Sequence, residues 1–301
     1  MNKLKQILPK LAFGTWPISG AREWGAFNEK EALNVLSALL ENNIICLDSA
    51  AIYGLGGAEN LLGKFFKTTQ RNKFILTSKC GLLPSERAVK FDLSANSLKT
   101  QIEDSLRRLN TDYLDIYFLH WPDKNTPLEE TLMQMEKFKK AGKIRFIGLS
   151  NFTENLIRQA VKITQIDCLQ NEFSVLKQDN KKLFPLVKEL DLAFMAYGVL
   201  NGGILSGKYK STPNLSKTDV RSFFYQSYKG ENFIKAQKII ALLKQISPSS
   251  TAQTAINFVL SFEEVSCAIF GAKNLKQLKE NVGALSWKLT TKQKEFLCKI
   301  Q

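Results

Sequence analysis

The feature that most constrains the fold is a repeat in which short apolar runs alternate with longer amphipathic stretches. Eight runs have the length and composition of strands, and they cover residues 11–16, 45–49, 74–80, 114–120, 144–151, 168–173, 193–198 and 267–271. The stretches between them have the apolar spacing of helices, and they cover residues 29–42, 58–68, 94–109, 127–141, 153–164, 180–190, 232–246 and 274–285, with a further piece at 251–262. A strand followed by a helix, eight times over, predicts parallel strands joined by helical crossovers.

This repeat within 301 residues predicts an α/β fold, the (β/α)8 or TIM barrel, with residues 1–301 forming a single domain. The strand runs are continuously apolar, as expected when both faces of a sheet are covered. An open doubly wound sheet is the rival fold. Its dinucleotide-binding glycine motif is missing after the first strand, and Gly54-Leu55-Gly56-Gly57 has the wrong spacing and follows the second strand.

Local signals support several helix boundaries. Asn28 precedes two glutamates and predicts an amino-terminal cap. Pro127 is expected in a first turn, and Gly142 suits a left-handed helix end. The longest irregular stretch, residues 205–230, is rich in Lys, Ser and Tyr, and its shape does not follow from the pattern.

Composition narrows the classes of function. The net charge of +14 comes from scattered lysines and arginines rather than a basic run interleaved with aromatics, so we expect no nucleic-acid partner. A basic surface can instead attract an acidic substrate or a phosphorylated cofactor. The five cysteines are odd in number and form no C-x-x-C pair, which predicts reduced thiols without a zinc cage. No apolar run could span a membrane and the start does not read as a signal peptide, so we expect a cytoplasmic protein.

Four polar residues lie at or just past the ends of three consecutive strands: Asp48, Tyr53, Lys79 and His120. Neighbouring strand ends meet at the mouth of a barrel, so we expect these side chains to converge. A phenol is a weak acid with a pKa of about 10. A nearby ammonium lowers that pKa, and a carboxylate beyond the ammonium holds it in place. The phenol could then protonate an alkoxide as it forms, with the imidazole orienting a carbonyl oxygen.

Each residue also has a purely structural interpretation. Asp48 could cap a turn, Tyr53 could pack with its hydroxyl exposed, and Lys79 could pair with any carboxylate. His120 could pack at a strand end against a backbone partner. Because it is the chain's one histidine, sites that need two are excluded; we expect no metal, and a metal-dependent barrel hydrolase is disfavoured.

The four residues resemble the aldo-keto reductase family, in which Asp, Tyr, Lys and His occur in this order at similar spacing. The likeness extends over nearly the full chain, through Phe13-Gly14-Thr15-Trp16, Leu47-Asp48-Ser49-Ala50, Tyr53-Gly54 with Glu59 and Gly63, Leu119-His120-Trp121-Pro122, Ile147-Gly148-Leu149-Ser150-Asn151-Phe152, Ile269-Phe270-Gly271-Ala272-Lys273 and Gln277-Leu278-Lys279-Glu280-Asn281. The resemblance implies a TIM-barrel oxidoreductase that uses NAD(P)H to reduce an aldehyde, ketone or sugar carbonyl. It implies that Tyr53 is the general acid, or the base in oxidation. Lys79 would tune Tyr53, Asp48 would hold Lys79, and His120 would orient the substrate.

The same resemblance implies a set of cofactor-binding residues. Ser150 and Asn151 match the pair that binds the nicotinamide carboxamide, with Gln170 beside them, and Tyr197 matches the aromatic that stacks on the ring. Lys273 could reach a ribose 2′-phosphate, and Glu280 and Asn281 match the adenine contacts. The remaining candidates are Thr15, Trp16, Leu200, Gly271 and Gln277.

Many relatives have arginine where this chain has Gln277, and a lysine grips phosphate less specifically than a guanidinium does. We therefore expect NADP(H), with NAD(H) left open.

Alternatives remain at several of these positions. Ser150 and Asn151 could cap a helix, and Tyr197 could belong to the core. Trp16, Trp121, Phe223 and Phe224 are candidates for the substrate pocket, although core packing is the favoured interpretation of the two phenylalanines. The partner implied is a small carbonyl or alcohol substrate, and the oligomeric state is not indicated. The alternative function is a nicotinamide-binding regulatory subunit, like the relatives of this fold that serve potassium channels.

Overall fold

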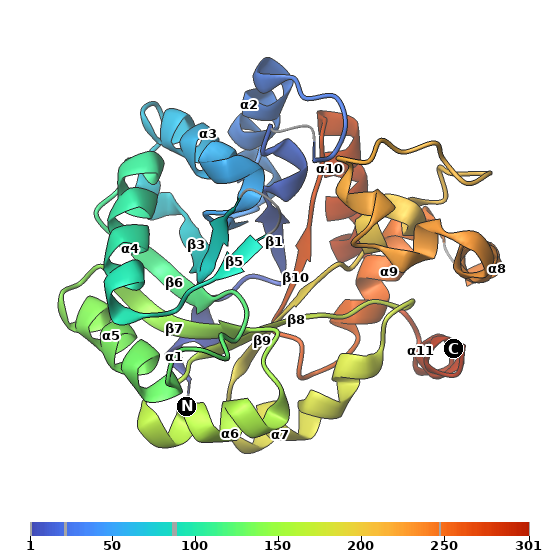
Figure 1. Ribbon diagram of the computed structural model, residues 1–301. Helices are drawn as coiled ribbons and strands as arrows, with labels where there is room; N and C mark the ends of the chain where they lie inside the picture. The colour runs from blue at the N-terminus through green and yellow to red at the C-terminus, as the bar shows by residue number, and fades with distance from the viewer. Residues whose placement is uncertain (1, 21–22, 86–88, 247, 301) are drawn as a thin grey trace.

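The computed structural model describes residues 2–20, 23–85, 89–246 and 248–300. In this part of the chain, parallel strands close into a barrel that helices surround (Figure 1). The barrel strands are β1 (Leu11–Gly14), β2 (Cys46–Asp48), β3 (Ile75–Cys80), β6 (Leu114–Leu119), β7 (Ile144–Ser150), β8 (Cys168–Glu172), β9 (Ala193–Tyr197) and β10 (Cys267–Phe270). Each strand pairs with the barrel strand before it in the chain, and β1 pairs with β10 to close the ring. The predicted (β/α)8 barrel is thus confirmed, and the open sheet is wrong.

The helices fall where the amphipathic stretches predict them. They are α2 (Glu29–Ser37), α3 (Gly57–Phe66), α4 (Ala95–Leu109), α5 (Leu128–Lys140), α6 (Glu154–Ile163), α7 (Phe184–Glu189), α8 (Gly230–Ile246), α9 (Thr251–Leu260) and α10 (Leu275–Val282). The Asn28 side chain caps α2 by accepting the Glu31 N–H at 3.1 Å, and Gly142 has a φ of +74°, both as expected. Pro127 is the cap residue of α5 rather than a first-turn residue. None of the described helices is both long and apolar enough to cross a membrane.

Four elements were not predicted. They are α1 (Lys3–Ile7), α11 (Thr291–Cys298), and the antiparallel pair of β4 (Leu82–Pro84) and β5 (Val89–Phe91). Leu4 of α1 is fully buried and packs into the cluster inside the barrel. The Asn2 side chain donates to the backbone oxygen of Asp167, just before β8 begins, at 2.7 Å. The first helix therefore closes the amino-terminal end of the barrel.

Two layers of apolar side chains make the core. One fills the barrel and includes Phe118 and Met195, and the larger one lies between the strands and the helices. The Phe118 ring lies so close to Gly148 that a β-carbon there would be 2.2 Å from it. This strand therefore needs a glycine to let a neighbouring ring fill the barrel.

Helix α3 is clamped both to its neighbouring helix and to the barrel. A β-carbon at Gly63 would be 2.0 Å from the backbone oxygen of Arg108, so α3 and α4 are in close contact there. The fully buried Glu59 accepts hydrogen bonds from Ser78 Oγ at 2.6 Å and from Arg108 Nε at 2.7 Å. Ser78 is in β3 and Arg108 is in α4, so these contacts hold the strand and the two helices in one arrangement.

We predict that Gly63→Ala destabilises the protein by about 2–3 kcal/mol, because the added methyl must push two packed helices apart. Lys64→Ala is the matched control, since its ammonium makes only an exposed pair with Glu29 and should change stability by less than about 1 kcal/mol. Urea unfolding measures both changes. Equal stabilities of the two variants would contradict the close contact.

Candidate active site

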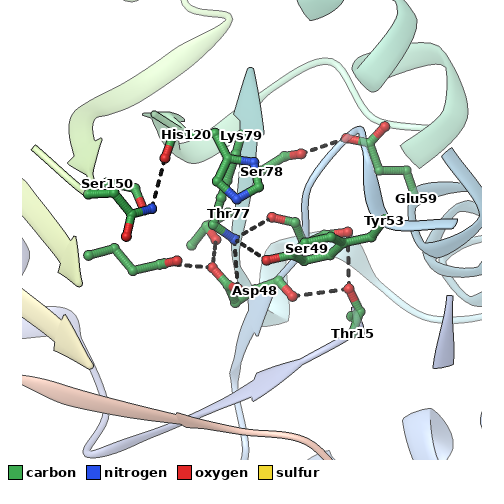
Figure 2. Close-up of polar contacts among 12 residues, drawn as sticks. Thr15, Asp48, Ser49, Tyr53, Glu59, Thr77, Ser78, Lys79, His120 and Ser150 are labelled. Carbon is green, nitrogen blue, oxygen red and sulfur yellow. Dashed lines mark hydrogen bonds and ion pairs between the residues drawn. The ribbon is translucent and has the colours of Figure 1, made fainter. Parts of the chain in front are cut away.

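The carboxyl ends of β2, β3 and β6 bring together the four polar residues predicted to converge. Asp48 ends β2, Lys79 is the penultimate residue of β3, and His120 directly follows β6. Tyr53 begins the short helical turn η3 (Tyr53–Gly56), between β2 and α3. Figure 2 shows the Lys79 side chain directed at Asp48 and Tyr53. The Asp48 carboxylate therefore pairs with Lys79 rather than capping a turn, whereas pairing with a strand-end carboxylate was itself the structural interpretation of Lys79.

Lys79 is the centre of the polar network. Its Nζ donates to Asp48 Oδ2 at 2.8 Å, to the backbone oxygen of Ser49 at 2.8 Å, and to Tyr53 Oη at 3.3 Å. The other carboxylate oxygen of Asp48 accepts from Thr77 Oγ1 and Gln170 Nε2, both at 2.8 Å. Lys79 is 1% exposed and Asp48 is 3% exposed, so this ion pair lies inside the protein. A buried pair is tolerated only when its remaining polar atoms are satisfied, as they are here.

The Tyr53 ring is held by aromatic neighbours. The indole of Trp16 stacks on it, with ring centroids 5.1 Å apart and planes 12° from parallel. The His120 imidazole meets it edge to face at 5.9 Å. Gly54 and Leu55, which follow Tyr53, both have left-handed φ angles, of +57° and +54°. This tight turn directs the phenol back toward the barrel mouth.

Burial, rather than Lys79, dominates the proton affinity of Tyr53. Desolvation raises the pKa of Tyr53 well above its usual value, and the charge of Asp48 adds to the rise. Desolvation also lowers the pKa of Lys79, although Asp48 opposes this change. The expectation that Lys79 brings the pKa of Tyr53 below its usual value is therefore wrong. The Tyr53 phenol therefore keeps its proton at neutral pH.

His120 is neutral at pH 7. Its burial and the nearby charge of Lys79 hold the pKa of the imidazole well below 6.5. Its backbone groups are paired, with Cys80 and with the Asn151 side chain, but the buried Nδ1 has no partner among the described residues. A side chain satisfied by a backbone partner was the structural alternative for His120, and the free ring nitrogen contradicts it.

A cavity of about 370 Å³ opens over these residues. Its walls include most of the residues predicted to bind cofactor or substrate, namely Trp16, Asp48, Tyr53, His120, Trp121, Ser150, Asn151, Gln170, Tyr197, Leu200, Gly271, Lys273 and Gln277. They come from strands far apart in the sequence, so barrel closure is what assembles them.

One end of the cavity carries several groups able to hydrogen-bond an amide. Asn151 has a φ of +63° and its side chain accepts from Tyr197 Oη at 2.8 Å while donating to Ser150 Oγ at 3.0 Å. The helix that follows is capped by Thr153 instead, so the helix-cap alternative for Ser150 and Asn151 is wrong. Tyr197 lines the cavity and is not a core tyrosine.

Three predicted cofactor residues do not line this cavity. The Thr15 hydroxyl donates to the backbone oxygen of Asp48 at 3.0 Å and contacts Ser49 Oγ, so it is occupied inside the barrel. The Asn281 amide donates to the backbone oxygen of Gly271 at 3.2 Å. Glu280 is half-buried and its backbone oxygen accepts from Gln253. These three side chains therefore lie outside the cavity lining, and their predicted contacts with a cofactor stay predictions.

Comparisons with known proteins identify the family. The sequence model of the "Aldo/keto reductase family" matches residues 10–300. The chain belongs to the aldo/keto reductase family. This membership makes it an oxidoreductase of carbonyl groups, and the family uses nicotinamide cofactors.

Individual relatives agree over nearly the whole chain. An "NADH-specific methylglyoxal reductase" of Escherichia coli is 27% identical over 94% of this chain and 91% of its own length. The "Aldo-keto reductase yakc [NADP(+)]" of Schizosaccharomyces pombe is 28% identical over 94% and 85%. Among solved structures, the glycerol dehydrogenase AKR11B4 from Gluconobacter oxydans superposes with a TM-score of 0.87, at 27% identity over 97% of this chain and 91% of that one.

In this aldo/keto reductase, three cations gather at the other end of the cavity, where α10 begins. Lys273, Lys208 and Arg221 all line it. The charges of Arg221 and Lys208, together with burial, lower the pKa of Lys273, so the three interact. Arg221 is partly neutralised by Asp219 through an Nε–Oδ1 contact of 2.8 Å. The sequence analysis identified only Lys273, because the other two lie in the irregular segment 205–230.

The same segment corrects the prediction for two phenylalanines. Phe223 and Phe224 are 56% and 37% exposed and line the cavity, so their expected core packing is wrong. Phe224 meets the Trp16 ring edge to face at 5.4 Å. Trp24, Leu82 and Val89 extend the apolar wall, and none of them was singled out from the sequence.

We predict that Asp48→Asn destabilises the protein by about 3–5 kcal/mol, because it leaves the Lys79 ammonium buried without a counter-charge. Asp104→Asn is the control: it removes an aspartate from an exposed pair with Arg107 and should cost less than about 1 kcal/mol. Urea unfolding at pH 7 gives both values. Wild-type stability of the Asp48 variant would show that the pair does not govern the fold at this site.

Proposed function

We propose that this aldo/keto reductase is an NADP(H)-dependent enzyme in which Tyr53 is the general acid that protonates the carbonyl oxygen of an aldehyde, ketone or sugar. The observation that carries the proposal is the hydrogen bond from the buried Lys79 ammonium, itself paired with Asp48, to Tyr53 Oη. A phenol in contact with a fixed cation can release a proton where charge develops on a substrate.

The four residues have distinct roles in this proposal. During reduction, Tyr53 gives its proton to the carbonyl oxygen and becomes a phenolate, which Lys79 stabilises through its charge and hydrogen bond. Asp48 keeps Lys79 charged and in place. Neutral His120 orients the carbonyl through a ring N–H. A bound nicotinamide supplies the hydride that the carbonyl carbon receives. In oxidation, the Tyr53 phenolate takes the alcohol proton.

The donor set of the cavity fits such a cofactor. Ser150, Asn151 and Gln170 present amide and hydroxyl groups near Tyr197, as a carboxamide and an aromatic ring require. Leu200, Gly202 and Gly203 line the same cavity as Tyr197 and the cationic residues. There Gly271, Lys273 and Gln277 lie around the start of α10, whose positive dipole end favours a phosphate. The Asn274 side chain caps this helix by accepting the Gln277 N–H at 2.9 Å.

The choice of NADP(H) over NAD(H) is supported by the positive charge of Lys208, Arg221 and Lys273. A 2′-phosphate adds about two negative charges, and the cationic end of the cavity complements them. The named relatives include both an NADH-specific reductase and an NADP(+) enzyme, so the family alone does not decide.

The substrate side of the cavity is aromatic, with Trp16, Trp24, Trp121, Phe223 and Phe224 around the entrance to Tyr53. Such walls exclude water and favour a small carbonyl compound with apolar surface. We also propose a cytoplasmic location, which is supported by free, buried thiols at Cys46, Cys80, Cys168 and Cys267.

We predict that Tyr53→Phe lowers kcat for carbonyl reduction at least about a hundredfold, because it removes the proton donor. The Kd for NADPH should change less than about twofold, since the phenol acts on the substrate. Tyr113→Phe is the matched control: its ring lies between Arg71 and Arg145, outside the cavity, and the variant should keep full activity. A panel of small carbonyls with NADPH measures turnover, and nucleotide titration measures binding.

Two results would contradict this role. If Tyr53→Phe retained most of its activity, the proton donor would be another group. If the wild type bound NADPH tightly but turned over no carbonyl and copurified with a protein partner, the regulatory alternative would replace the enzyme.

We predict that Lys273→Ala weakens NADPH binding by about tenfold to a hundredfold, which corresponds to about 1.4 to 2.7 kcal/mol from a charged contact. NADH binding should weaken much less, because that cofactor lacks the 2′-phosphate. Lys276→Ala, in the helix α10 that follows Lys273 but outside the cavity lining, is the control and should leave both affinities unchanged. Equal losses for the two nucleotides would remove the 2′-phosphate role of Lys273.

A further inference from the structure

Glu23 connects several parts of the cavity through a single oxygen. It lies between β1 and α2 and lines the cavity. Its Oε2 accepts from Trp16 Nε1 at 2.8 Å, from the backbone N–H of Gly54 at 3.2 Å and from Ser19 Oγ at 3.3 Å. No motif in the sequence marks this residue, and its role does not follow from the four-residue network.

Two of these three donors control Tyr53. The Trp16 indole is the ring that stacks on the Tyr53 phenol, and Gly54 is the next residue along the chain. Glu23 therefore fixes Tyr53 in two ways, through the indole that stacks on its ring and through the backbone of the residue that follows it. Close packing reinforces the arrangement, since a β-carbon at Gly54 or at Gly57 would be 2.1 Å from the backbone oxygen of Ser19.

The segment that carries Glu23 is itself tethered to the far side of the cavity. The Glu23 backbone oxygen accepts from the Val220 N–H at 2.8 Å. The backbone oxygens of Trp24 and Ala26 accept hydrogen bonds from Lys273 Nζ. Because these contacts hold the segment in place, the carboxylate is fixed where the Trp16 N–H and the Gly54 N–H can reach it.

We propose that Glu23 is a positioning residue for Tyr53, whose carboxylate fixes the stacked indole and the turn that aim the phenol at the substrate. This inference rests on the proposed role of Tyr53 as the general acid. It adds to that role a residue that touches neither the Tyr53 hydroxyl nor Lys79 in the network described above.

The charge of Glu23 gives the proposal a distinctive signature. The charged and titratable groups that act on Tyr53 are Glu23, Asp48, Lys79, His120, Tyr197 and Tyr225. The negative charge of Glu23 contributes to raising the pKa of Tyr53. Neutralising Glu23 therefore lowers that pKa. Reduction needs the protonated phenol and is lost as the pH rises through its pKa, so the basic limb of the kcat profile moves to lower pH.

We predict that Glu23→Gln lowers kcat about tenfold with little change in KM, because misplacing a reacting group costs rate rather than binding. The basic limb of the pH profile should move down by on the order of half a pH unit, as expected for the loss of one partly screened charge. Glu23→Asp keeps the charge and should restore the limb to its wild-type position. Glu31→Gln removes an exposed carboxylate from the first turn of α2 and is the control, with no shift.

The assay is carbonyl reduction by NADPH from pH 6 upward, using a small aromatic aldehyde as the probe, with thermal melting of each variant. Trp16→Phe is a second variant that loses the indole N–H while keeping a ring and the Glu23 charge. It should lower kcat without moving the limb, and it tests the positioning even if Glu23→Gln does not fold.

The outcomes separate this inference from the proposed function. If Tyr53→Phe is inactive while Glu23→Gln keeps the wild-type kcat and limb, Tyr53 is the acid and Glu23 does not position it. If Trp16→Phe also keeps its full kcat, the hydrogen bond from the indole to Glu23 does not position the phenol. If Tyr53→Phe stays active, the proposed acid itself is wrong, whatever the Glu23 variants do.

Discussion

The rest of the site depends on one buried ion pair, between Lys79 and Asp48. An ammonium removed from water costs several kcal/mol unless a counter-charge and hydrogen bonds replace its hydration. Asp48 supplies the charge, and Thr77 and Gln170 satisfy the second oxygen of its carboxylate. These groups belong to β2, β3 and β8. The pair can therefore form only in the closed barrel, which ties the chemistry to the fold.

Strand β3 contacts a buried carboxylate on each of its two faces. Because successive side chains of a strand point in opposite directions, Lys79 reaches Asp48 at the barrel mouth while Ser78 reaches Glu59 of α3 on the outer side. Arg108 of α4 completes the outer contact at 2.7 Å. The turn that carries Tyr53 connects β2 to α3. It is anchored at both ends, because Asp48 at the end of β2 and Glu59 in α3 are both held by hydrogen bonds. Its left-handed residues and its contact with Ser19 leave the phenol little freedom.

The sequence predicted what short-range patterns encode. Continuous apolar runs identify the barrel strands, and polar residues at their ends identify Asp48, Lys79 and His120. It did not predict contacts between distant segments. Val220 donates to Glu23 almost two hundred residues away in the chain, and this contact places Phe223, Phe224 and Arg221 at the cavity rather than in the core. Leu4 fills the barrel from a helix too short to show a period. Thr15 has the right motif, but its hydroxyl is already bonded to the second strand.

Under the proposed role of Tyr53 as the general acid, its electrostatics make the ion pair favour proton transfer rather than simple binding. Judged from Lys79 alone, the phenol should be unusually acidic, but burial and Asp48 raise its pKa instead. In the resting protein the phenol thus keeps its proton, and the Lys79 ammonium donates a hydrogen bond of 3.3 Å to a neutral oxygen. Once the proton leaves, the same ammonium faces a phenolate in a site shielded from water, where the attraction is far stronger. An interaction that strengthens as charge develops lowers the activation free energy without making the substrate bind more tightly in the ground state. Because Lys79 is already fixed in position, this needs little reorganisation of the protein.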